Sequence, residues 1–461
     1  MSRAQRLVLS IAVLASFVAF LDGTIVNVAL PAIEEELGGG LITQQWVVDS
    51  YLITLGALIL VAGSVSDAFG RILVLRIGLI GFGIASIAVA ASPDPLFLII
   101  ARAAQGAAAA FLVPSSLALI TSTFRGPSQG RAIGMWTAMT TTAMIAGPLI
   151  GGIFVDFFSW RLAFLINVVP IAITLVLLHL LHQHDDRRAG ARIDWLGAAL
   201  CTLGLGGTVF ALIEQPRLGW DSPVIWVTLG GGILLFVLFL LRQRTAPQPI
   251  LPLDLFRVRN FSFGNITTAF MYGALALNGF VVVVYLQTGA GMPATLAGLA
   301  SIPITVLMVL LSSRMGTLAG RWGPRLFMTV GPLLMAAGCL LLLTVGEDFS
   351  YWTQVLPGMI VLGLGLATTV SPLTSAILGA IDTERSGIAS AVNNAVSRVA
   401  GLIAIAMLGA IVGGSLDLNG FHRAAIVTAV FMAVAGIVSF IGIRNPARTT
   451  TDAEASPVDA D

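Results

Sequence analysis

A series of apolar runs constrains this chain more than any other feature of its sequence. A membrane-spanning helix needs about 20 mainly apolar residues, and runs long enough to span recur fourteen times along the 461 residues. The runs lie near residues 7–30, 43–65, 72–92, 95–121, 131–155, 161–181, 194–213, 223–241, 261–285, 294–314, 324–345, 353–378, 386–412 and 422–443. Their length and continuity exclude the shorter alternating strands of a membrane β-barrel. The sequence therefore predicts an all-α polytopic membrane protein with fourteen transmembrane helices.

The composition excludes most soluble classes of protein. Hydrophobic residues make up 57% of the chain and charged residues only 10%, whereas an ordinary soluble chain is about half apolar and about a quarter charged. Charge this sparse argues against a cytosolic enzyme, a disordered scaffold or a nucleic-acid binder. Fourteen spans use about 280 residues, which leaves no room for a second soluble domain. The two cysteines, Cys201 and Cys339, lie inside apolar runs, and we expect neither a metal nor a cofactor.

Arginine sets the expected orientation of the spans. All 24 basic residues are arginine, and the cytoplasmic loops of membrane proteins carry the excess of positive charge. Nineteen arginines fall on the side of the two termini, three fall on the other side, and Arg102 and Arg398 lie within spans. This asymmetry predicts that both termini are cytoplasmic.

The sequence contains a weak internal repeat. GSVSDAFGR at 63–71 leaves the second span, and GTLAGRWGPR at 316–325 leaves the tenth. Parallel six-span repeats build one large class of secondary transporters, in which the substrate site lies between the two halves. We therefore expect four parts in the chain. They are an N-terminal six-helix half at 1–181, two inserted helices with linkers at 182–260, a C-terminal six-helix half at 261–443 and a disordered tail at 444–461.

Charged residues inside spans are the first candidates for function, because a charge is expensive in lipid. Asp22 lies in the first span, Asp49 in the second and Arg102 in the fourth. At 1.5 Å per residue, all three lie at a similar depth in the half of the membrane away from the termini. An acid whose arginine partner comes and goes can load and release a proton. We interpret Asp22, Asp49 and Arg102 as proton-coupling residues; the alternative is a static ion pair that fixes helix packing.

The connection between the second and third spans offers a conformational latch. Gly63 and Gly70 permit a tight turn and close packing. Asp67 can reach a helix amino terminus or a neighbouring arginine, and Arg71 follows four residues later. The alternative is a plain loop that only sets topology.

The fifth span carries a cluster of small residues around a proline. Gly147 and Gly151 have the small-xxx-small spacing that lets helices approach closely, and Pro148 and Gly152 lie beside them. Pro148 predicts a kink. A bent and tightly packed span suits a moving seam between the two halves, whereas the alternative is ordinary membrane packing.

Polar residues within other spans are candidates to line a central cavity. They are Asn27, Gln105, Asn167, Asn265, Asn278, Gln287, Asn393, Asn394 and Arg398.

Several of these motifs resemble the major facilitator superfamily. The stretch from Gly63 to Arg71 looks like its cytoplasmic loop motif, and Arg102-Ala-Ala-Gln105-Gly106 is similar to its fourth-span motif. The stretch from Gly147 to Gly152 looks like the antiporter signature of exporters. LDGTIVNVALP, WRLAFLINVVP and SGIASAVNNAVSRVAG resemble the fourteen-helix drug:proton antiporters of the EmrB/QacA type.

The resemblance implies a major facilitator fold with two six-helix halves plus two inserted helices. It also implies a proton-coupled efflux antiporter of a bacterial plasma membrane, with the Arg102 position taking part in proton coupling. Its partners would be protons, a small amphiphilic substrate and the lipid bilayer, and we expect a monomer. Alternatives are a dedicated exporter of one metabolite or antibiotic, a proton symporter for uptake, which the fifth-span signature disfavours, and a polytopic membrane enzyme or sensor.

The sequence departs from the family pattern in two places. Ala68 and Ile72 stand where the loop motif usually has basic residues, which predicts a weaker latch. The thirteenth span has no acidic residue, whereas members that export dications have an additional membrane acid. The second departure favours monovalent, zwitterionic or neutral amphiphiles as substrates.

Overall fold

The computed structural model describes residues 1–181, 193–382 and 385–445, and the fourteen predicted spans all lie on helices. Nine spans are single helices: α1 (Arg3–Leu37), α2 (Gly40–Phe69), α3 (Arg71–Ala90), α6 (Pro127–Phe157), α9 (Trp195–Leu218), α10 (Pro223–Thr245), α11 (Arg259–Thr288), α16 (Ser386–Ala406) and α18 (Leu418–Gly442). Five spans have two segments: α4 (Pro95–Ala109) with α5 (Leu112–Thr123), α7 (Trp160–Leu165) with α8 (Val168–Leu180), α12 (Ala294–Leu299) with α13 (Ile302–Trp322), α14 (Pro324–Leu341) with η2 (Leu342–Thr344), and η3 (Tyr351–Val355) with α15 (Leu356–Leu378). The short segments η1 (Leu253–Arg257) and α17 (Leu408–Val412) complete the described secondary structure, which includes no strand. The sequence-based prediction of the spans is confirmed.

Proline explains where three of the two-segment spans break. A proline has no N–H to donate to the carbonyl four residues earlier, so the helix is interrupted there. Pro114, Pro170 and Pro303 leave the carbonyls of Ala110, Ile166 and Leu299 without that donor, and α4, α7 and α12 end at or one residue before these positions, at 109, 165 and 299. The break between α7 and α8 contains Asn167.

The two halves repeat the same helix junction. Gly70 joins α2 to α3 with φ 102°, and Gly323 joins α13 to α14 with φ 87°. Both values lie in the left-handed region that favours glycine. The two glycines are 253 residues apart, which is the offset of the sequence repeat. The repeat therefore extends to backbone geometry, whereas the precise limits expected for the four parts stay a prediction.

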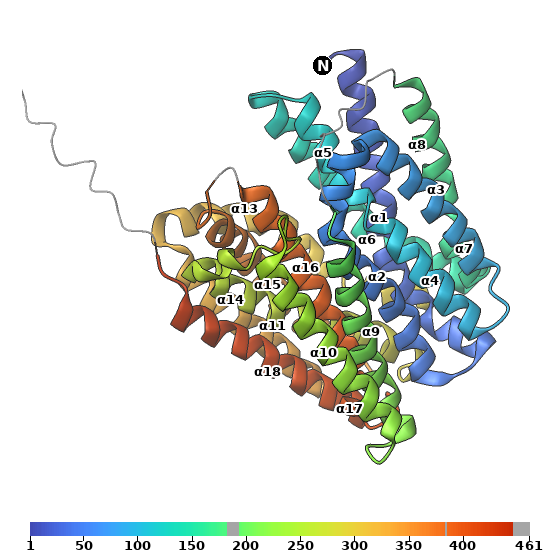
Figure 1. The fold of residues 1–461 in the computed structure, drawn as a ribbon. Helices are drawn as coiled ribbons and strands as arrows, with labels where there is room; N and C mark the ends of the chain where they lie inside the picture. Colours follow the sequence, from blue (N-terminus) through green and yellow to red (C-terminus); the bar gives the residue numbers. More distant parts are fainter. Residues whose placement is uncertain (182–192, 383–384, 446–461) are drawn as a thin grey trace, which may run out of the picture.

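The halves meet at one face of the membrane domain and diverge towards the other. We call the face at which α1 begins and α18 ends the terminal face, and the opposite one the far face. Figure 1 shows the N-terminal half, in blue to green, leaning away from the C-terminal half, in yellow to red, at the end where the N-terminus lies. Towards the far face, one buried apolar cluster joins α1 and α7 to α11 and α18, and includes Leu30, Phe164, Phe280 and Phe421.

The space around helix α6 also narrows from the terminal face to the far face. A Cβ atom added at Gly130 or Gly134, towards the terminal face, would have no heavy atom within 4 Å. At Gly151 it would lie 2.5 Å from the Ile25 side chain, and at Gly152 2.6 Å from a backbone atom of Thr295. The structure is therefore sealed at the far face.

The inserted helices α9 and α10 form a hairpin against both halves. Asp194 accepts hydrogen bonds from the Gly197 N–H at 3.0 Å and from Gln243 Nε2 at 3.0 Å, which ties the start of α9 to the end of α10. Along its length α9 packs on α2 of one half and on α16 and α17 of the other. Figure 1 shows α9 between α2 and α16.

Two predicted regions fall partly outside the described residues. The 182–192 part of the first linker and residues 446–461 of the tail belong to them. The linker after α10 has no regular secondary structure apart from the short segment η1.

Candidate functional site

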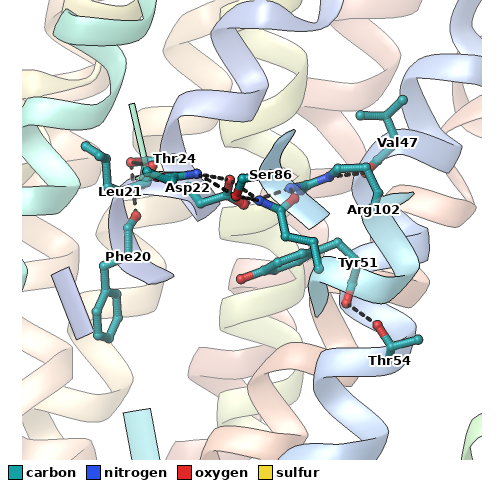
Figure 2. A network of polar contacts seen from close by, with 11 residues as sticks. Phe20, Leu21, Asp22, Thr24, Val47, Tyr51, Thr54, Ser86 and Arg102 are labelled. Carbon is teal, nitrogen blue, oxygen red and sulfur yellow. Dashed lines mark hydrogen bonds and ion pairs between the residues drawn. The ribbon is translucent and has the colours of Figure 1, made fainter. Parts of the chain in front are cut away.

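Asp22 and Arg102 form a buried ion pair inside the N-terminal half. Arg102 Nη1 lies 2.7 Å from Asp22 Oδ2, and both side chains are at most 1% exposed. Figure 2 shows the two side chains pointing toward one another from different helices, with Ser86 beside them. The structure brings these two residues together, and the proton-coupling role that the sequence suggested for them stays a prediction.

The second oxygen of Asp22 is held by two amides. Gln105 Nε2 and Asn167 Nδ2 each donate to Oδ1 at 2.9 Å. Gln105 also donates to Ser86 Oγ at 2.9 Å. Asn167 can reach the carboxylate because it lies at the break between α7 and α8. Both carboxyl oxygens of Asp22 therefore accept hydrogen bonds.

Arg102 has partners besides Asp22. Its Nε donates to the Val47 carbonyl at 3.0 Å, and its Nη1 donates to Gln105 Oε1 at 2.6 Å. Its guanidinium carbon lies 4.4 Å from the centre of the Tyr51 ring and 5.5 Å from that of Phe164, within range of cation–π attraction. Arg102 lies on α4, and Asp94 caps the start of that helix by accepting a hydrogen bond from the Phe97 N–H at 2.9 Å. The cation thus keeps several interactions that do not depend on Asp22.

Asp49 does not join this ion pair, contrary to the expected grouping of the three charges. Each residue of an α-helix turns by about 100°, so Asp49 lies on the opposite side of α2 from Val47 and Tyr51, which face Arg102. Asp49 is fully buried, and neither carboxyl oxygen has a hydrogen-bond partner among the described residues. The number of residues from the end of the span indicates the depth of Asp49 in the membrane, but it does not indicate which side of the helix Asp49 faces.

The fifth-span motif packs on two different neighbours. A Cβ at Gly147 would meet Thr24, and one at Gly151 would meet Ile25, so both glycines receive α1 of their own half. Gly152 faces the backbone of Thr295, in α12 of the other half. The Pro148 carbonyl also lies 2.7 Å from where a Cβ at Gly298 of α12 would be. The groove predicted for Gly147 and Gly151 is present, but the seam between the halves lies at Gly152 and Pro148.

Asp156 adds a contact between the halves that the sequence did not single out. Its carboxylate accepts from the backbone N–H groups of Ala294 and Thr295, both at 2.8 Å, and from Thr295 Oγ1 at 2.6 Å. These groups begin α12, so the carboxylate caps a helix of the opposite half. Gln45 makes a comparable contact elsewhere on the seam, because its Nε2 donates to the carbonyls of Ile405 and Ala406 at 2.6 and 3.1 Å.

The latch motif is only partly what its sequence suggested. Gly70 forms the expected tight junction, but Gly63 lies within α2, and a Cβ there would have no atom within 4 Å. Its predicted role in a tight turn and close packing is wrong, because the helix continues to Phe69. Arg71 Nη1 donates to the Ala118 carbonyl of α5 at 3.3 Å. The side chain of Asp67 lies outside the described part of the chain, so its role stays a prediction.

The cavity candidates divide into four groups. Gln105 and Asn167 belong to the Asp22 network. Asn393 Nδ2 bonds Asn265 Oδ1 at 3.1 Å and Thr268 Oγ1 at 2.8 Å, which joins α16 to α11 within the C-terminal half. Gln287 donates to the Val28 carbonyl at 3.2 Å across the seam. Asn27, Asn394 and Arg398 are partly exposed and Asn278 is buried, and their role in substrate binding stays a prediction.

The match to known families identifies the scaffold. Residues 12–405 match the family model described as Major Facilitator Superfamily. The chain belongs to the major facilitator superfamily. The D-xylose–proton symporter structure has the same fold, with a TM-score of 0.69 at 14% identity over 95% of this chain and 98% of that one.

Relatives of this facilitator include resistance proteins of bacteria. It is 34% identical to the methylenomycin A resistance protein of Bacillus subtilis over 88% of this chain and 87% of the relative. It is 33% identical to the multidrug resistance protein Stp of Mycobacterium tuberculosis over 90% of this chain and 78% of the relative. This facilitator is therefore a multi-pass membrane transporter and not an enzyme.

Proposed function

We propose that this transporter is a proton-coupled antiporter that exports lipophilic or amphiphilic small molecules by alternating access. Its relatives carry names of resistance to methylenomycin A and to multiple drugs, which supports efflux of compounds of that kind. The excess of arginine on the side of the termini supports a cytoplasmic terminal face in a bacterial cell. In that orientation the structure is sealed towards the outside.

The buried ion pair of Asp22 and Arg102 carries the proposal of proton coupling. A proton on Asp22 removes its charge and weakens the bond to Arg102 Nη1. The arginine then keeps Val47, Gln105 and the two aromatic rings as partners, so it does not become an isolated buried cation. Breaking a buried ion pair is strongly destabilising when the remaining charge has no other partner. Arg102 does have other partners, so this ion pair suits reversible protonation of Asp22.

A continuous set of contacts leads from Asp22 to the seam between the halves. Leu21 and Thr24, beside Asp22 on α1, meet α6 at Gly147. On the next turn of α6, Gly152 meets the other half. A small movement of α1 on protonation would therefore reach the seam through helices that are already in contact.

The charge pattern supports a substrate without multiple positive charges. Asp22 is neutralised by Arg102, and α16 contributes Arg398 but no acid. In the middle of the membrane, α1 and α16 therefore contribute no acid that lacks a cationic partner. We therefore favour neutral, zwitterionic or monovalent amphiphiles.

Transport by purified protein in liposomes with an imposed pH gradient tests the proposal. A panel of amphiphilic compounds should be transported against their gradients, and Asp22→Asn should abolish this transport while inserting normally. Glu36→Gln is a matched control, because Glu36 also pairs with an arginine, Arg161, but on the far face. It should retain transport.

Two outcomes would change the conclusion. Wild-type rates for Asp22→Asn under the gradient would remove Asp22 from the coupling mechanism. Transport of a single compound from a broad panel would indicate a dedicated exporter on the same scaffold.

A further inference from the structure

Asp49 lies on the face of α2 that meets the C-terminal half. Residues four and seven apart share one face of an α-helix. Gln45, four residues earlier, bonds the end of α16 through Ile405 and Ala406. A Cβ at Gly56, seven residues later, would lie 3.8 Å from Arg398 Cβ, also on α16. Asp49 is therefore an acid buried in the seam between the halves, on the side covered by α9.

The charged groups around Asp49 are engaged elsewhere. On α9, Glu214 accepts from Trp46 Nε1 at 2.9 Å and from Arg217 Nε at 2.7 Å. On α4 and α1, Arg102 and Asp22 bond each other on the opposite side of α2.

Arg398 on α16 does not compensate Asp49 either. It lies at the level of Gly56, about 10 Å along α2 from Asp49. Arg398 makes no bond to Asp49, because neither carboxyl oxygen of Asp49 has a partner among the described residues, and Arg398 Nε has none either. Among the described residues, Asp49 thus has neither a donor nor a counter-ion within hydrogen-bonding reach.

A small cavity leads from the far face towards this acid. It has a volume of about 170 Å³ and is lined by residues of three elements, among them Gln45 of α2, Arg217 of α9, and Gly409 and Gly414 at α17. This is room for several waters, since a water occupies about 30 Å³ in the liquid. Gln45 is fully buried, and its Oε1 has no partner in the described part of the chain. Asp49 lies about 6 Å deeper than Gln45, one helical turn further along α2.

We propose that Asp49 is a second proton-binding site, which exchanges its proton with far-face water through this cavity, and that Gln45 is its gate. The inference rests on the proposed function, because it adds an acid to the same proton-coupled cycle. A buried carboxylate without partners is far more costly than the neutral acid. Asp49 is therefore protonated in the state in which the seam is sealed.

Opening of the seam changes this balance. When the halves part at the far face, the two bonds of Gln45 to α16 break and water reaches Asp49. The acid then transfers its proton to water and becomes an anion, with no other bond formed or broken. In the reverse direction, a proton from the far side neutralises Asp49 and permits the seam to close. Asp22 differs in that its charge stays compensated in the sealed state.

Distances across the far face test the proposal directly. Spin labels at Ala91 and Ser415, which are exposed in far-face loops of the two halves, report opening in the full-length protein in nanodiscs. A proton bound by only one of two states shifts their ratio by up to about tenfold per pH unit. In the wild type, the long-distance population should rise by about tenfold or more between acidic and alkaline pH. Asp49→Asn should keep the short distance at every pH, and Asp49→Glu should restore the dependence.

Two control variants distinguish the effect of Asp49 from the effects of the other acids near it. Glu214→Gln changes another buried acid of the same seam, but one that is already hydrogen-bonded, and it should keep the wild-type pH dependence. Asp22→Asn should lose proton-driven transport and still keep the pH dependence of the far-face distance. The proposal about Asp49 can thus fail while the coupling role of Asp22 stands, and the reverse.

Clear results would overturn the inference. A wild-type pH dependence in Asp49→Asn, or its loss in Glu214→Gln, would exclude Asp49 as the titrating group. If Asp49→Asn does not fold, Gln45→Ala decides the question. Removing the two bonds to α16 should move the midpoint of opening to lower pH, and an unchanged midpoint would refute the gate.

Discussion

Adding one methyl group at Gly152 should unseal the far face. In Gly152→Ala the new Cβ would lie 2.6 Å from the Thr295 backbone nitrogen and 3.0 Å from the Ala294 carbonyl carbon. Both are backbone atoms of the other half, so no side-chain rotation relieves the clash. Because carbon atoms pack at about 3.5–4.0 Å, the two halves must separate locally by about 1 Å.

The magnitude follows from the contacts that this separation breaks. Asp156 holds the start of α12 with hydrogen bonds of 2.6 to 2.8 Å, and a further 1 Å takes them beyond bonding distance. Asp156 is exposed, so water replaces part of this loss. Overpacking of a tight contact costs about 1–3 kcal/mol. Applied to the sealed state alone, that cost shifts the ratio of open to sealed molecules by about 5- to 150-fold.

The label pair at Ala91 and Ser415 measures this shift as the fraction of long distances at constant pH. Gly130→Ala is the matched control, since Gly130 lies on the same helix with open space around it. Both variants gain the same intrinsic helix preference for alanine over glycine, which cancels in the comparison. Equal distance distributions for Gly152→Ala and the wild type would refute the view that this contact seals the halves.

Three further results are expected. Gly151→Leu should impair turnover more than substrate binding, measured as transport rate against equilibrium binding, because it forces α6 away from α1; unchanged turnover would reduce this stretch to ordinary packing. Single cysteines at Ser222 and Ser456 should respectively label and resist impermeant thiol reagents in intact cells, and rapid labelling at Ser456 would overturn the assigned orientation. The Arg385 guanidinium, 2.6 Å from the Asp254 carboxylate, holds the pKa of that group below its ordinary value. The stability from this pair is present above the ordinary aspartate pKa and is lost as pH falls through the lowered value, so Asp254→Asn should lower the melting temperature at neutral pH, and the difference should vanish on acidification.

The sequence was sufficient for the fold because lipid imposes a strict rule on it. Every spanning segment must satisfy its own backbone, so a long apolar run can only be a helix. The pairing of Asp22 with Arg102 was also predictable, because opposite charges at the same depth in lipid usually form an ion pair. Depth is set by residue count from the span ends, which sequence provides directly.

The rest of the site depended on which helices are neighbours, and sequence does not provide that. Asp49 has the depth of Arg102 but faces α16 and α9, which no residue count reveals. Asp156 and Glu214 lie near the ends of their spans. A charge is costly at the centre of the bilayer and not at its surface, so neither acid stood out in the sequence. Gln45 is a single polar residue whose importance comes only from the carbonyls at the end of α16.

The placement of the α9–α10 hairpin has a consequence for how a lipophilic compound reaches the interior. Two six-helix halves that part on one side of a bilayer leave two flanks along which their edges could admit molecules directly from the lipid. On one flank α9 lies against α2 and α16, so acyl chains there meet the hairpin and not the gap between the halves. The flank beside α6 and α13 has no such cover from the hairpin. Lateral access from the leaflet should therefore be one-sided, so that compounds partitioned in lipid approach the transporter beside α6.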